Sequence, residues 1–209
     1  MLFRSGLTMA VHSQSASPTT AARLDLFGTL AVDDDAVIVE FATSTGADTR
    51  NGAELDGVLG GTLNPPRNVT VTTTADASTY NTTDPIVISG TDVAGTSITE
   101  NVTLTNANGG ETKTGTKVFA TVTSVVFPAM LTTNGGIRVG VGARVGLRYK
   151  PFLSSGGFPY AQPYVDGTPI DVGTVPPIAS GGAGPWGAYD FTGAIGGTEL
   201  GAVYVEDLS

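Results

Sequence analysis

Short runs in which apolar and polar residues alternate recur along most of this chain, and this period of two limits its fold more than any other feature. The runs are rich in Val, Ile and Thr, and they are separated by Gly, Asn, Asp or Pro. Because a β-strand places successive side chains on opposite faces, the pattern predicts antiparallel strands joined by turns. We therefore predict an all-β fold, an antiparallel β-sandwich or β-barrel. The expected strands cover residues 36–42, 68–74, 85–90, 97–105, 117–127, 137–141, 144–149 and 201–206.

The runs are most regular in residues 65–150, which we predict to be the core β-domain. Prolines open and close this segment, and glycines inside it mark turns. Residues 1–64 are expected to form an extended N-terminal arm plus one peripheral strand. A short helix is expected to begin at Ser17, which can cap it, and Pro18, and to run through Leu24. Residues 151–209 are expected to form a loop-rich C-terminal extension whose final hairpin packs on the core.

The chain has no cysteine and a single histidine, His12. Disulfides, thiolate chemistry and Cys-ligated zinc are therefore excluded, and a His-dependent triad would need a residue of the polar N-terminal segment. No apolar stretch approaches the roughly 20 residues of a membrane span, and the N-terminus lacks the apolar core of a signal peptide. We therefore expect neither membrane insertion nor export.

Charge is sparse and unevenly placed. Charged residues make up 14% of the chain, and the net charge is −9. Residues 112–165 nevertheless contain six basic residues and no acidic one, between two acidic segments. A net negative chain is repelled by nucleic acid, so we expect this basic block to meet an acidic protein surface or the chain's own acidic segments. The residues predicted to form a docking face are Arg138, Arg144, Arg148 and Lys150.

Three patterns resemble sites of chemistry, and each has a simpler interpretation. Asp33, Asp34 and Asp35 could join a Ca²⁺ shell, but Ca²⁺ takes about six to eight oxygens, so a solvated turn is expected. The glycines of residues 140–146 alternate in strand rhythm with no helix after them, which predicts a bulge or a close backbone approach rather than a phosphate loop. The carboxylates that could in principle pair for glycoside hydrolysis are Asp84, Asp92, Glu100 and Glu111. A sugar cleft would also need aromatic platforms, which residues 65–150 largely lack, so an enzyme is not expected.

Glu100 breaks the alternation of its run. Ile98, Val102 and Leu104 share one face of the expected strand, and Glu100 falls on that same apolar face. It must therefore meet a partner, lie at the sheet edge or reach solvent past a bulge.

The order of the β-segments is similar to that of a known module. The telling pieces are PRNVTVT, GTD-x-x-G-x-x-ITE, GTK-x-F-x-TVTSV and VGVG-x-x-VGL, within residues 65–150, and the segment from VDGTPIDVG to GAVYVEDLS extends the similarity toward residue 206. Together they resemble structural proteins of tailed-bacteriophage virions, notably head decoration (auxiliary capsid, or cement) proteins.

This resemblance implies a non-enzymatic virion protein without cofactors, made in the host cytoplasm and located on the capsid exterior. Its partners would be the major capsid protein and copies of itself, as a homotrimer that bridges capsomers and stabilises the shell, with no nucleic acid or membrane partner. The alternative is a phage tail- or fibre-associated adhesin or a carbohydrate-binding module. Trp186 is a candidate partner contact in either case, although it could also cover one end of the core.

Overall fold

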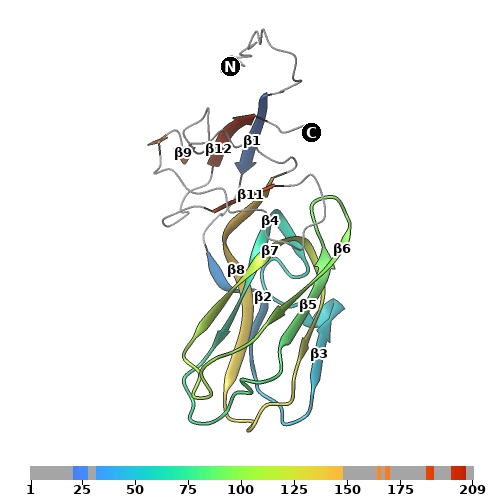
Figure 1. Cartoon of the computed structure of the whole chain (residues 1–209), viewed down its shortest axis with the longest axis vertical. Helices are drawn as coiled ribbons and strands as arrows, with labels where there is room; N and C mark the ends of the chain where they lie inside the picture. Colours follow the sequence, from blue (N-terminus) through green and yellow to red (C-terminus); the bar gives the residue numbers. More distant parts are fainter. Residues whose placement is uncertain are drawn as a thin grey trace.

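The computed structural model describes residues 32–147 and, beyond them, the strands that lie within 21–27 and 164–205 (Figure 1). Side chains are described for residues 32–146. The strands are β1 (Ala21–Phe27), β2 (Asp33–Ala42), β3 (Asp48–Asn51), β4 (Thr62–Thr73), β5 (Ile86–Thr91), β6 (Ser97–Val102), β7 (Thr112–Phe127), β8 (Gly136–Leu147), β9 (Tyr164–Val165), β10 (Thr168–Pro169), β11 (Gly187–Asp190) and β12 (Glu199–Val205). One 3-10 turn, η1 (Gly52–Glu54), lies between β3 and β4.

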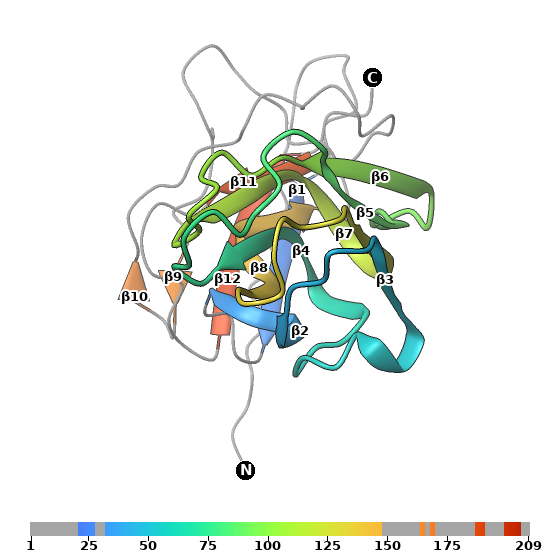
Figure 2. The ribbon, with the colours of Figure 1, turned by 90° about the horizontal axis from the view of Figure 1, so that it is seen from below.

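One antiparallel sheet, in the order β11-β8-β4-β7-β5-β6, contains most of the described strands. β2 adds to β8, and β3 adds to β7. The long strand β7 pairs with β4 through residues 112–121 and with β5 and β3 through residues 121–127, so it belongs to two layers. Viewed along the long axis in Figure 2, the strands curve around a common centre. The all-β antiparallel prediction is confirmed, and the sheet is sandwich-like and not closed into a barrel.

The core lies between these layers and is built from the apolar positions of the alternating runs. Val69 and Val71 of β4 face inward with Phe119 and Val125 of β7 and Ile88 of β5, and all are essentially buried. Phe127 packs edge-on against Phe41, with ring centroids 5.1 Å apart. These contacts explain why the period-two pattern located the strands correctly.

β2 corrects the expected domain boundary at residue 65. Ala36, Val37 and Ile38 are buried in the core, and β2 pairs with β8. The amides of Gly57 and Leu59 donate to the carbonyls of Val37 and Ala36, so a loop covers the free edge of β2. Strand β2 is therefore part of the core β-domain. The sequence pattern did not show this, because the pairing of β2 with β8 joins residues about a hundred positions apart.

One further expectation about the flanks, the short helix that was to end at Leu24, was wrong, and the packing of the final hairpin on the core stays a prediction. Residues 21–27 form strand β1 rather than the end of a helix, and β1 pairs along its whole length with β12. β12 in turn pairs with β9, which gives a separate four-stranded sheet, β1-β12-β9-β10. The C-terminal strand that does join the main sheet is β11, on β8. Strand pairing between distant segments outweighs local helix-capping signals here.

The loops at one end of the sheet meet around Tyr80. The hydroxyl of this buried residue lies 2.8 Å from the carbonyl oxygens of both Thr74 and Gly136. Gly109 has a φ of +64°, and a Cβ there would lie 2.3 Å from the Tyr80 ring, so glycine is required on both counts. In the described part of the chain, no helix is long and apolar enough to cross a lipid bilayer.

Candidate functional site

Among the described residues, the most unusual buried polar contacts lie at two β-bulges that face Asn68 of β4. Between the pairs Asn68–Val118 and Thr70–Thr114, β4 advances two residues while β7 advances four. Between the pairs Arg67–Val145 and Val69–Val141, β4 again advances two residues while β8 advances four. Both neighbours of β4 therefore bulge at the same level, which frees backbone groups from the hydrogen-bond ladder.

Asn68 satisfies the freed groups on both sides. Its side-chain nitrogen donates to the Gly115 carbonyl of β7 at 2.9 Å, and its side-chain oxygen accepts from the Arg144 amide of β8 at 2.9 Å. The residue is buried. A Cβ on Gly142 would lie 2.7 Å from both polar atoms of this amide, so the glycine leaves room for it. Asn68 therefore joins three strands where their ladder is interrupted.

Glu100 of β6 faces the β7 bulge, and this bulge supplies the partners that its position on the apolar face of the strand requires. Its carboxylate accepts from the Thr116 amide at 2.5 Å, the Thr116 hydroxyl at 2.9 Å and the Lys117 amide at 3.2 Å. The side chain is buried, so of the three alternatives that the sequence left open, Glu100 meets a partner. A buried carboxylate that accepts several donors holds a loop in shape, and its oxygens are already occupied.

Arg67 is a buried cation beside the same bulges. Its guanidinium donates through Nε, at 2.7 Å, and through Nη2 to the Gly142 carbonyl of the β8 bulge. Burial lowers the pKa of Arg67 to about 10, so the group stays protonated at neutral pH.

Arg67 also lines a cavity of about 610 Å³ beside the start of β2. Most of the residues that line this cavity are apolar, and the side chains of two of them, Val32 and Val58, are exposed to solvent. The remaining lining residues are Asp33, Asp34, Ala36, Leu59, Asn64, Pro65 and Val141.

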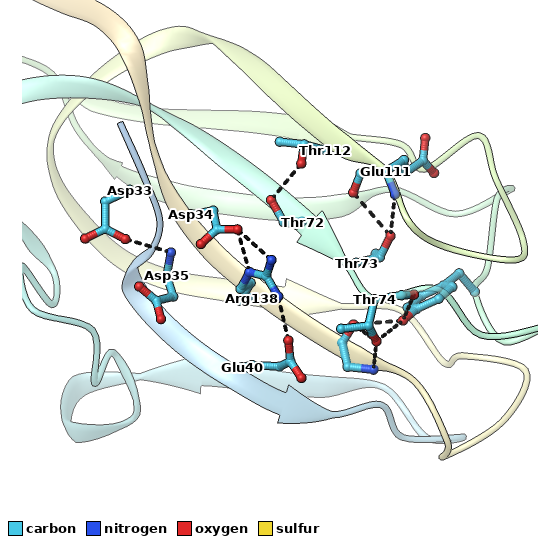
Figure 3. A network of polar contacts seen from close by, with 12 residues as sticks. Asp33, Asp34, Asp35, Glu40, Thr72, Thr73, Thr74, Glu111, Thr112 and Arg138 are labelled. Carbon is cyan, nitrogen blue, oxygen red and sulfur yellow. Dashed lines mark hydrogen bonds and ion pairs between the residues drawn. The ribbon is translucent and has the colours of Figure 1, made fainter. Parts of the chain in front are cut away.

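The basic block meets an acidic segment of its own chain at Arg138 (Figure 3). Arg138 Nη2 lies 2.6 Å from Asp34 Oδ2, and Arg138 Nη1 lies 2.5 Å from Glu40 Oε2. The hydrogen bond to Asp34 is the main reason why the pKa of Arg138 is raised. The network ties β8 to β2, so Arg138 has structural partners within the chain.

The three adjacent aspartates open strand β2 rather than forming the expected solvated turn. Their carboxylate oxygens lie within 4.8 Å of one another. Asp33 Oδ1 accepts from the Asp35 amide at 3.1 Å, and Asp34 is held by Arg138. The pKa of Asp35 is raised, first by a side-chain hydrogen bond with Asp33 and second by burial. The carboxylates are thus partly used inside the fold, and Arg138 competes with any cation at Asp34.

The other candidate carboxylates bond their own loops. Asp92 accepts from the amides of Ala94 and Thr96, in the turn that Gly95 completes with a φ of +80°. Glu111 accepts from the amides of Thr105 and Asn106, both at 2.8 Å. Asp84 bonds the Asn81 side chain. Each acts locally, as an acidic side chain in a turn commonly does.

Residues 140–146 are strand β8 and its bulge, as their rhythm predicted. A Cβ on Gly140 would lie 2.0 Å from the Asp33 carbonyl oxygen, so β2 crosses close over this glycine. The glycines therefore serve close backbone approach.

The predicted docking residues divide between described and undescribed parts of the chain. Arg138 and Arg144 both lie on β8, and Arg144 Nη1 donates to the Thr116 carbonyl across the β7 bulge. Arg148, Lys150 and Trp186 lie outside the residues whose side chains are described. The docking face thus stays a prediction.

Sequence reasoning missed Arg67 and Asn68, the two residues that organise the bulges. The available signal was a polar pair, Arg67-Asn68, at the start of an otherwise alternating strand, together with a glycine-rich partner strand.

No protein-family model, curated protein or solved structure matches this chain. The functional proposal therefore depends on the contacts above and on the sequence resemblance.

Proposed function

We propose that this chain is a virion structural protein, a phage head decoration protein that binds the outer capsid surface and bridges capsomers. The observation that carries the proposal is how the core uses its buried polar groups. Arg67, Asn68 and Glu100 all bond backbone atoms at the two bulges. Polar groups used in this way stabilise one shape, and a protein that reinforces a capsid shell needs a fixed shape.

The described surface also suits extensive contact with other proteins. Its strands expose Thr, Ser and Asn in place of most charged residues; on β6, for example, Ser97, Thr99 and Asn101 are exposed. Burying a hydroxyl that finds a partner costs less free energy than burying Lys or Glu. A standard interface of roughly 1,600 Å² at each of many capsid sites would give strong total binding even where each contact is modest.

Two regions are proposed to contact the capsid. One is the N-terminal arm, residues 1–30, and the other is the face of Arg138, Arg144, Arg148 and Lys150. Because β1 pairs with β12, deleting residues 1–20 tests the arm without removing a strand. Arg138 is held by Asp34 and Glu40, so its loss would also disturb β2.

The deciding experiment adds purified protein to heads that lack it and measures occupancy by gel and by negative-stain imaging. We expect the full chain to decorate the heads, and the chain lacking residues 1–20 to lose attachment. Charge reversal at Arg148 should lower occupancy and its dependence on salt, with charge reversal at Lys113, in the same basic block, as the matched control. Full occupancy by both variants would contradict the proposed contacts.

Failure of the full chain to bind any head would contradict the decoration role itself. Imaging of virions labelled through this chain separates the alternatives, because a label on the tail would support the adhesin. Glycan binding that is lost in Trp186→Ala would point to the carbohydrate-binding alternative.

A further inference from the structure

The main sheet has an open seam between β6 and the first half of β7. β6 is the last strand of the sheet order and pairs only with β5. Residues 112–118 of β7 pair with β4 on one side. Among the described strands, no backbone pairing joins β6 to this part of β7. Each of these two strand edges therefore lacks a hydrogen-bond ladder on the side away from its partner.

Side chains close this seam at one level. The Glu100 carboxylate of β6 reaches across to the amides of Thr116 and Lys117 in the β7 bulge. In the opposite direction, the Lys117 Nζ donates to the Thr99 carbonyl of β6 at 2.5 Å. We name these contacts of Glu100 and Lys117 the seam latch. Each partner binds the other strand's backbone, so the latch occupies groups that would otherwise be open to another strand.

The direction of the Thr99 carbonyl shows which backbone groups the latch covers. In an antiparallel pair, a residue either exchanges both backbone bonds with its opposite residue or points both groups away. Because the Thr99 carbonyl meets Lys117, its amide also points away from β5 toward the seam. The outward edge of β6 therefore carries a donor and an acceptor at Thr99, and Lys117 covers the acceptor.

Without the latch, β6 has the properties of a strand edge that pairs with other chains. Its exposed side chains, Ser97, Thr99 and Asn101, carry no charge, and the strand contains neither proline nor lysine. Exposed edges of this kind are templates for strand addition, and a lysine beside the edge is a common way to prevent it. Lys117 supplies that protection from the neighbouring strand.

We propose that the Lys117 contact of the seam latch keeps β6 from pairing with β6 of a second copy of this chain, and that loss of this contact turns β6 into a self-association surface. We choose a second copy as the partner because β6 can pair antiparallel with β6 of another copy about a two-fold axis. In such a contact, the same edge of both copies is used, and the same backbone groups are exchanged in both directions. The exposed β6 side chains are uncharged and bring no like-charge repulsion to that contact, although the whole chain is strongly negative. The proposal does not depend on the virion assignment.

The test compares wild type, Lys117→Met and the double variant Lys117→Met with Thr99→Pro by sedimentation velocity over a range of concentrations. Methionine keeps the length of the side chain and removes the ammonium group. We expect about tenfold tighter self-association in Lys117→Met, from the exposed acceptor alone. Proline at position 99 removes the outward amide without removing a β5 bond, so the double variant should return to the wild-type distribution.

Lys113→Met is the matched control, because it removes the same charge from the same strand. Lys113 pairs with Glu111 and bonds Thr105 rather than β6, so this variant should sediment like wild type. Lys117→Leu, which also has no donor, is measured in parallel so that a folding defect in one variant does not decide the result. The proposal is overturned if both Lys117 variants match the control, or if adding Thr99→Pro to Lys117→Met leaves the self-association unchanged.

Discussion

Replacing Asn68 by alanine tests whether the paired bulges stabilise the fold. The change removes two hydrogen bonds of 2.9 Å and leaves the Gly115 carbonyl and the Arg144 amide without that partner. An unsatisfied buried backbone group costs about 1–3 kcal/mol, and the half-buried Arg144 falls at the lower end. We expect a total loss of about 2–4 kcal/mol, a large part of the roughly 5–15 kcal/mol by which a domain is stable.

The assay is urea unfolding followed by circular dichroism, with thermal melts as a second measure. For a chain of this length, the expected loss corresponds to a fall in Tm of about 5–15 °C. Asn68→Asp should be at least as destabilising as alanine, because an ionised carboxylate only accepts and would face the Gly115 carbonyl. Asn101→Ala is the control, since Asn101 is exposed on β6 and should change stability by less than about 0.5 kcal/mol. If Asn68→Ala lowers the free energy of unfolding no more than this control, the paired bulges do not depend on the Asn68 bonds for stability.

Two further outcomes are expected. Gly115→Ala should lose about 1–3 kcal/mol in urea unfolding, because overpacking is costly and its Cβ would lie 2.5 Å from Glu100 Oε2 and 3.0 Å from the Val69 carbonyl oxygen. Gly46→Ala, whose Cβ would lie 3.8 Å from Ser44 Oγ, should change little. Tyr80→Phe should lose about 1–3 kcal/mol near neutral pH, because the carbonyls of Thr74 and Gly136 lose a donor. Burial also raises the pKa of Tyr80 above its ordinary value, so the folded state holds this proton more tightly than the unfolded state. Wild type should therefore lose stability as pH rises above about 10, and Tyr80→Phe should lose less over that interval. Equal slopes for the two proteins in alkaline urea titrations would contradict this cause.

The strands were predictable because their signal is local. Burial on one face of a sheet requires alternation, and β5 and β6 lie where their runs indicated. The runs 137–141 and 144–149 proved to be one strand, β8, because the break between them is the bulge at residues 142–144. β3 was missed, since four polar residues, DTRN, carry no apolar alternation. Its pairing with β7 decides its conformation.

The amino-acid sequence by itself determined the all-β class, the position of most strands and the conflict at Glu100, since each follows from the alternation of neighbouring side chains. Only the tertiary structure decided how that conflict is resolved. Glu100 is satisfied by amides of Thr116 and Lys117, which are free because β7 bulges opposite Asn68. A bulge is set by the relative register of two strands, and register depends on contacts between segments far apart in the chain. The local sequence pattern therefore showed that a buried polar group such as Glu100 needs hydrogen-bond partners. It did not show which residues those partners are.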